Sequence, residues 1–150
     1  MDTMQVHARR LADAVEVALP GWVERSVARR LPGVDDGVRS AASDAGARAR
    51  AEVGAEVRAL LELDIDEQRT TPLTLLRAAV RYPTEVLRAA AVPPVERDRA
   101  QERLFPDDVY DLTPAMFADV DPALADPGLA WGAAKAFTHL RRHREPQVGR

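Results

Sequence analysis

Four dipeptides in the second half of the chain place a proline directly after a threonine or an aspartate, a pattern typical of helix starts. The side-chain oxygen accepts a hydrogen bond from a free amide of the first turn. Proline fits the first helical position because an amide at that position has no acceptor within the helix, so the lack of an N–H costs nothing there. The four are Thr71-Pro72, Thr113-Pro114, Asp121-Pro122 and Asp126-Pro127. Because eight of the eleven prolines lie between residues 72 and 127, the helices of this half must be short.

Short helices are accordingly predicted for the second half, and β-strands are not. The helices are expected at residues 72–81, 84–91, 95–104, 114–119 and 127–143. Apolar and polar residues alternate, as in a half-buried strand, over residues 62–66, but this run is too short and too acidic to be more than a linker. The predicted fold class is all-α.

Two longer helices are predicted for the first half. Apolar residues recur at three- and four-residue spacing over residues 4–19, which indicates one amphipathic helix that Pro20 and Gly21 then interrupt. A short helix is expected at 22–30 and a second long one at 35–63. Alanine and glycine residues make up much of the surface of the first half of the second long helix. Another backbone can therefore approach it closely, either that of the first helix or that of a second copy of the chain.

These patterns divide the chain into an N-terminal helical arm, a compact helical domain and a flexible tail. They cover residues 1–63, 64–143 and 144–150, respectively. The domain is expected to hold the core, because six of the seven aromatic residues lie between Tyr82 and Phe137. The candidate core residues are Leu73, Leu76, Val80, Val86, Leu87, Leu104, Phe105, Phe117, Leu129, Ala133, Phe137 and Leu140.

The composition excludes several classes of protein. With no cysteine among its 150 residues, the chain has no disulfide, no thiolate metal site and no cysteine nucleophile. No apolar run approaches the roughly 20 residues that span a bilayer, and the N-terminus lacks the apolar region of a secretory signal. A cytoplasmic protein without a cofactor is therefore expected.

Charge is spread unevenly along the chain. Residues 1–63 carry a net charge of −1, residues 64–128 carry −6 and residues 129–150 carry +4. Arginine supplies 20 of the 21 basic residues, a bias that a GC-rich genome accounts for, so its abundance does not indicate nucleic-acid binding. The basic C-terminus nevertheless leaves nucleic-acid association as an alternative function.

Two acidic turns, at residues 62–67 and 107–111, are candidate metal sites because hard divalent cations bind carboxylate oxygens. The candidate ligands are Asp64, Asp66, Asp107 and Asp108. A metal-dependent enzyme built on the two turns is one hypothesis for the function, and it gains support if the two turns meet in space. Against this, the first turn lacks the glycine of an EF-hand loop, and acids commonly collect before a helix N-terminus because that end is partly positive.

A partner-binding surface is predicted on the C-terminal helix. An aromatic side chain that shares a helix face with cations can anchor a protein partner or stack on bases, and Trp131 lies opposite the apolar stripe of this helix. The predicted partner-binding residues are Trp131, Lys135, Arg141 and Arg142. His139 and His143 have the spacing of metal ligands, but the neighbouring arginines oppose a bound cation.

The chain contains no catalytic motif. It has no glycine-rich phosphate loop, no Gly-x-Ser-x-Gly and no Ser–His–Asp grouping. The predicted function is therefore a non-enzymatic protein–protein interaction or regulatory module, which binds a protein partner or a second copy of the chain through residues 4–63 and binds no membrane. A nucleic-acid-associated factor and a metal-dependent enzyme are the alternatives.

Overall fold

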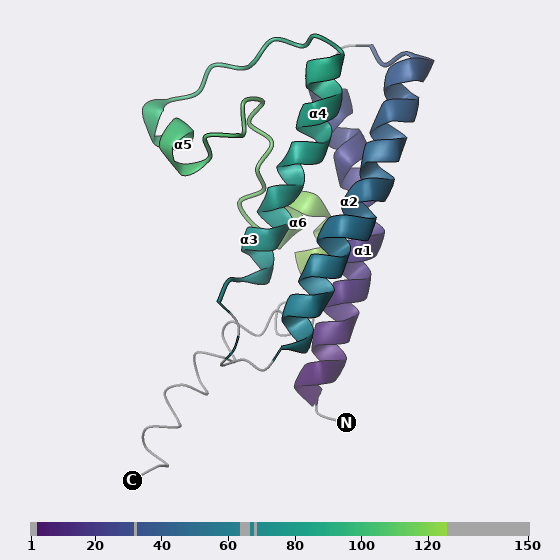
Figure 1. Cartoon of the computed structure of the whole chain (residues 1–150), viewed down its shortest axis with the longest axis vertical. Coiled ribbons are helices and arrows are strands. Elements are labelled where there is room, and N and C mark those ends of the chain that lie inside the picture. The colour runs from purple at the N-terminus through teal and green to yellow at the C-terminus, as the bar shows by residue number, and fades with distance from the viewer. Residues whose placement is uncertain (1–2, 32, 64–66, 68, 126–150) are drawn as a thin grey trace.

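The computed structural model describes residues 3–31, 33–63, 67 and 69–125. Every regular element among these residues is helical, so the predicted all-α class is confirmed (Figure 1). The elements are α1 (Thr3–Arg30), α2 (Asp36–Glu62), α3 (Pro72–Arg77), the 3-10 helix η2 (Ala78–Val80), α4 (Arg81–Ala89), α5 (Arg99–Leu104), α6 (Phe117–Val120) and the 3-10 helix η3 (Pro122–Ala125).

The two long helices, α1 and α2, form an antiparallel hairpin and lie side by side (Figure 1). Asp35 caps α2, because its side chain accepts a hydrogen bond of 2.8 Å from the amide of Val38. The Ala- and Gly-rich face of α2 is buried, as the sequence predicts for a helix that another backbone approaches. That partner is α1 of the same chain.

The predicted interruption at Pro20 and Gly21 is wrong, since α1 runs through both residues. A proline inside a helix loses one backbone hydrogen bond and crowds the carbonyl four residues earlier, at a cost of about 3 kcal/mol. Burial on both sides offsets this cost, because Leu19 and Val23 are both fully buried. The local rule fails here because the apolar stripe of α1 continues across the proline in the same register.

The two long helices approach each other closely at Gly46. A Cβ atom added there would lie 2.9 Å from Cα of Pro20 and 3.1 Å from its carbonyl oxygen. Two turns further along α2, a Cβ atom on Gly54 would meet Cγ of Glu16 at 2.8 Å. The α1 backbone therefore excludes a side chain at Gly46, whereas the obstacle at Gly54 is a movable side chain.

A third rod, made of α3, η2 and α4, packs against the hairpin. Its start confirms the sequence pattern: Pro72 is the first helical residue, and Oγ1 of Thr71 accepts from the amide of Thr74 at 3.2 Å. Pro83 does not break the rod, because it is the third residue of α4, where the amide has no partner within the helix.

The rod ends in a backbone conformation that glycine usually supplies. The amide of Ala91 donates to the carbonyl of Arg88, and that of Val92 donates to the carbonyl of Leu87, both at 3.0 Å. This pair of bonds is the Schellman motif, whose C′ residue is left-handed. Ala91 holds that position with φ of 59°, although its Cβ atom makes the left-handed region unfavourable.

The hydrophobic core is one cluster that draws residues from the hairpin and from the segments after it. Leu76, Val80, Val86 and Leu87 are buried as predicted. The prediction for Leu104 is wrong, since 71% of it is exposed, and Phe105 lies outside the cluster. The hairpin adds Leu11, Val15 and Val53, which are fully buried although they are not among the candidate core residues. Leu129, Ala133, Phe137 and Leu140 lie outside the described residues.

The helices after α4 differ most from prediction. Helix α5 begins four residues later than expected, at Arg99, where Asp98 caps it. Thr113 does not start a helix; instead, the carboxylate of Asp119 accepts from the amides of Ala115 and Met116 ahead of α6. Asp121 does precede a helical turn, since its carboxylate accepts from the amide of Ala123 at 2.9 Å. The predicted helix at 127–143 lies outside the described residues.

Candidate functional site

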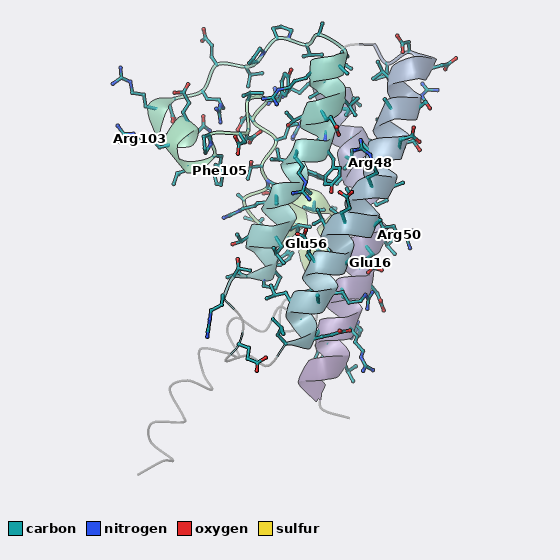
Figure 2. The ribbon with its side chains drawn as sticks, viewed as in Figure 1. Glu16, Arg48, Arg50, Glu56, Arg103 and Phe105 are labelled. Atoms are coloured by element: carbon teal, nitrogen blue, oxygen red, sulfur yellow. The ribbon has the colours of Figure 1, made fainter. Side chains whose placement is uncertain are left out.

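A groove of about 500 Å³ with several charged residues in its lining lies between α2 and α4, with the segment after α5 as a third wall. This volume falls within the range of about 300–1,000 Å³ that is usual for ligand pockets. Its charged lining residues are Arg48 and Glu52 from α2, Arg81, Glu85 and Arg88 from α4, and Asp107 from the segment after α5. Figure 2 shows Arg48 where α2 faces α4.

Tyr82 lines the groove from a buried position, with 2% of its surface exposed. Its hydroxyl donates a hydrogen bond to the Glu52 carboxylate and accepts one from Arg81 at 3.1 Å. The guanidinium carbons of Arg81 and Arg48 lie 5.0 Å and 5.8 Å from the ring centroid, within the range of cation–π attraction. Burial, and secondly the bond to Glu52, raise the pKa of Tyr82 above its ordinary value. The hydroxyl is therefore protonated at neutral pH and is no ready base or nucleophile.

Charged residues form a ladder along the groove. Arg48 of α2 bonds to Glu85 of α4 at 2.9 Å, and Glu52, one turn later in α2, bonds to Tyr82, one turn earlier in α4. The two helices therefore run antiparallel here. Beyond the Arg48–Glu85 rung lies Arg88, which has no ion pair or side-chain hydrogen bond with any described residue. Asp107 also has no such partner among the described residues.

Residues 92–110 form a second feature, which we call the projecting loop. Its base is closed by two hydrogen bonds: the Tyr110 hydroxyl donates to the carbonyl of Val92 at 2.5 Å, and the amide of Val95 donates to the carbonyl of Val109 at 3.0 Å. The loop carries α5 away from the hairpin (Figure 1), and Figure 2 shows Arg103 and Phe105 out at this position. No residue of α5 is buried.

Arginines bind the backbone of the last residue of the projecting loop and of the segment that follows it. Nη2 of Arg25 donates to the carbonyl of Val120 at 2.7 Å, and Nε of Arg30 donates to the carbonyl of Tyr110 at 2.8 Å. Arg77 likewise donates to the carbonyls of Pro114 and Ala115, each at 3.0 Å. No sequence signal points to these bonds, because the acceptors are backbone atoms 37 to 95 residues away from the donors.

The acidic turn at 107–111 has a structural explanation. Asp108 is buried, and its carboxylate accepts hydrogen bonds from the amides of Leu112 and Thr113. Asp107 is instead exposed in the groove. Among the described residues, no group of three or more His, Asp or Glu side chains is arranged to hold a metal ion. The other two candidate ligands, Asp64 and Asp66, lie outside the described residues, so the metal site stays a prediction.

The predicted partner-binding residues also lie outside the part of the chain that the structure describes. They are Trp131, Lys135, Arg141 and Arg142, and the pair His139 and His143 falls in the same segment. Sequence reasoning misses the groove, because Arg48 and Glu85 are 37 residues apart. One usable signal is the spacing of Arg81, Glu85 and Arg88, which places three charges on one face of a helix.

Comparisons with protein-family models, with curated proteins and with solved structures each find no match to this chain. Within the described ranges, none of the helices has the length and apolar character needed to cross a membrane. The chemistry of the described surface is therefore what bears on function. It offers guanidinium donors, carboxylate acceptors and an exposed leucine, all of which bind ligands noncovalently.

Proposed function

We propose that the protein is a non-enzymatic helical interaction module that binds a protein partner through the projecting loop. The observation that carries the proposal is the exposure of Leu104, which reaches 71% at the end of a helix with no buried residue. A large aliphatic side chain gains free energy when a partner covers it, by roughly 25 cal/mol for each Å² of apolar surface removed from water.

The base of the projecting loop supports the same proposal. Two hydrogen bonds close this base. Within the loop, Nη1 of Arg97 also donates to the carbonyl of Phe105 at 2.7 Å. The guanidinium of Arg77 in α3 also lies 5.6 Å from the ring centroid of Phe105. These contacts hold α5 in place before binding, which lowers the entropy cost of ordering a loop in a complex.

Partner capture with two matched variants tests the proposal. Leu104 and Val17 are each 71% exposed, but Val17 lies on α1, outside the loop. Tagged wild-type protein, Leu104→Ser and Val17→Ser are used as baits in extracts of the source organism, with and without nuclease. We expect a nuclease-resistant partner that Leu104→Ser loses and Val17→Ser retains. Equal retention by both variants would refute the role of the loop.

The same variants identify a second copy of the chain as the partner if that is what the loop binds. Self-association would appear as a concentration-dependent molar mass in light scattering, reduced by Leu104→Ser and unchanged by Val17→Ser. Partners that disappear with nuclease would favour the nucleic-acid alternative, whose predicted residues Arg141 and Arg142 would then be neutralised in turn. Such binding weakens steeply with salt.

A further inference from the structure

The groove between α2 and α4 contains a gap in its ion pairing. The ladder pairs Glu52 with the Tyr82 hydroxyl and Arg48 with Glu85, and then reaches Arg88, which makes no ion pair with any described residue. The α2 residue one turn before Arg48 is Asp44, which makes no ion pair with Arg88 although both residues are described. A guanidinium that is always charged and carries five donors thus faces the groove unpaired.

On the other wall of the groove, the carboxylate of Asp107 likewise has no cationic partner among the described residues. The six charged residues of the groove balance, with three arginines and three acids. A polyanion such as nucleic acid would meet three carboxylates there, and a metal ion would meet three guanidiniums. A ligand that carries one negative and one positive group would instead pair with both Arg88 and Asp107.

We infer that the groove binds a peptide segment with an acidic and a basic side chain, the acid at Arg88 and the base at Asp107. The inference rests on the proposed function, because Asp107 belongs to the projecting loop, so a protein seated on the loop can extend a segment into the groove. Buried Tyr82 and the Arg48–Glu85 pair form the fixed end of this site. Electrostatic complementarity of this kind selects among partners more than it adds affinity.

Blocked tetrapeptides test the site without the natural partner. The probe has glutamate first, arginine last and alanines between; controls replace one or both charged residues with glutamine. Binding to the full chain is followed by NMR through the side-chain Nε–H signals of arginine, with the Arg88 signal assigned from its loss in Arg88→Gln. We expect the doubly charged peptide to shift this signal and to bind about twofold to fivefold more tightly than either singly charged control, the range of exposed ion pairs.

Two variants and a control complete the design. Arg88→Gln and Asp107→Asn each remove one exposed charge without breaking a bond to any described residue, so folding is unaffected. Each is expected to weaken the doubly charged peptide twofold to fivefold, whereas Arg39→Gln, an exposed arginine near the start of α2 and outside the groove, leaves it unchanged. An uncharged peptide that binds equally well, or an Arg88 signal that no peptide moves, overturns the inference.

The two proposals fail separately. Partner capture that depends on Leu104 while no peptide moves the Arg88 signal overturns the groove and leaves the loop. Peptide binding that depends on Arg88 and Asp107, with capture that ignores Leu104→Ser, overturns the loop and leaves the groove.

Discussion

Alanine substitution at two glycines of α2 is expected to have opposite effects, although both sites lie inside the same helix. On propensity alone, Gly→Ala in a helix interior stabilises by about 1 kcal/mol. At Gly46 the new Cβ would lie 2.9 Å from Cα and 3.1 Å from the carbonyl oxygen of Pro20. Both atoms belong to the backbone of α1, so the two helices must move apart along a packed interface.

Two opposing contributions set the change in the free energy of unfolding for Gly46→Ala. Inserting a methyl group into a packed interface costs about 1–3 kcal/mol, and the upper half of that range applies at Gly46 because no side chain can rotate away. We expect Gly46→Ala to lower the free energy of unfolding by about 1–2 kcal/mol after the propensity gain.

At Gly54 the obstacle is Cγ of Glu16, at 2.8 Å, which can rotate at the cost of its bond to Arg58. That bond is part of a partly exposed ion pair and contributes about 0.5–1 kcal/mol. The propensity gain offsets this loss, so Gly54→Ala is expected to leave the free energy of unfolding within about 0.5 kcal/mol of wild type.

Urea unfolding, followed by circular dichroism, measures the difference. For a small protein m is about 1–3 kcal/mol per M of urea, so the two midpoints should differ by roughly 0.3–2 M. Gly37→Ala serves as a control near the start of α2, because its nearest contact is Oδ1 of Asp35 at an ordinary 3.4 Å. A Gly46→Ala protein as stable as Gly54→Ala would show that α1 and α2 are not in backbone contact at Pro20.

Three further substitutions test other parts of the fold. Ala91→Gly should raise the free energy of unfolding by about 0.5–1 kcal/mol in thermal melts, because glycine adopts φ of 59° without strain; a lower melting temperature would contradict the Schellman geometry. Asp108→Asn should lower it by about 1–3 kcal/mol, since a buried carboxylate that accepts amides of Leu112 and Thr113 loses charge-assisted bonds; unchanged urea midpoints would refute this. For Tyr82 the raised pKa means that the folded state holds its proton more tightly than the unfolded state does. Its contribution to stability is therefore complete below pH 10 and is lost as pH rises above that value. Tyr82→Phe should flatten the fall in melting temperature above pH 10, and an equal fall in both proteins would exclude the tyrosine as its source.

Local chemistry predicts helix starts in this chain, whereas tertiary packing decides where helices continue and which apolar residues are buried. Thr71 caps α3 as predicted, and Asp35 caps α2 by the same local chemistry, because a cap depends on atoms within three residues of it. Pro20 is misjudged because burial on the two sides of it outweighs the lost hydrogen bond, and that burial depends on α2. Leu104 is misplaced for a related reason: apolar spacing indicates a helix face, but it does not indicate whether another element covers that face.

The groove shows the same limit for the candidate site. Arg81, Glu85 and Arg88 share a helix face by spacing alone, so their clustering on α4 is predictable from sequence. The bonds from Glu85 to Arg48 and from Tyr82 to Glu52 are not, because they require the antiparallel contact of two helices that are distant in the chain. The charges that lack a partner among the described residues, Arg88 and Asp107, become visible only after the bonds of the other charges of the groove have been assigned.

The arginine bonds to the segment after the projecting loop bear on how this protein can change through evolution. The acceptors for Arg25, Arg30 and Arg77 are main-chain carbonyls, which every amino acid supplies. Side chains on that segment can therefore be exchanged without loss of these anchors, whereas each arginine on α1 and α3 is constrained by its length and its planar donors. Sequence drift should accordingly be fast at the exposed positions of the anchored segment, such as Ala115 and Met116, and slow at the three anchoring positions.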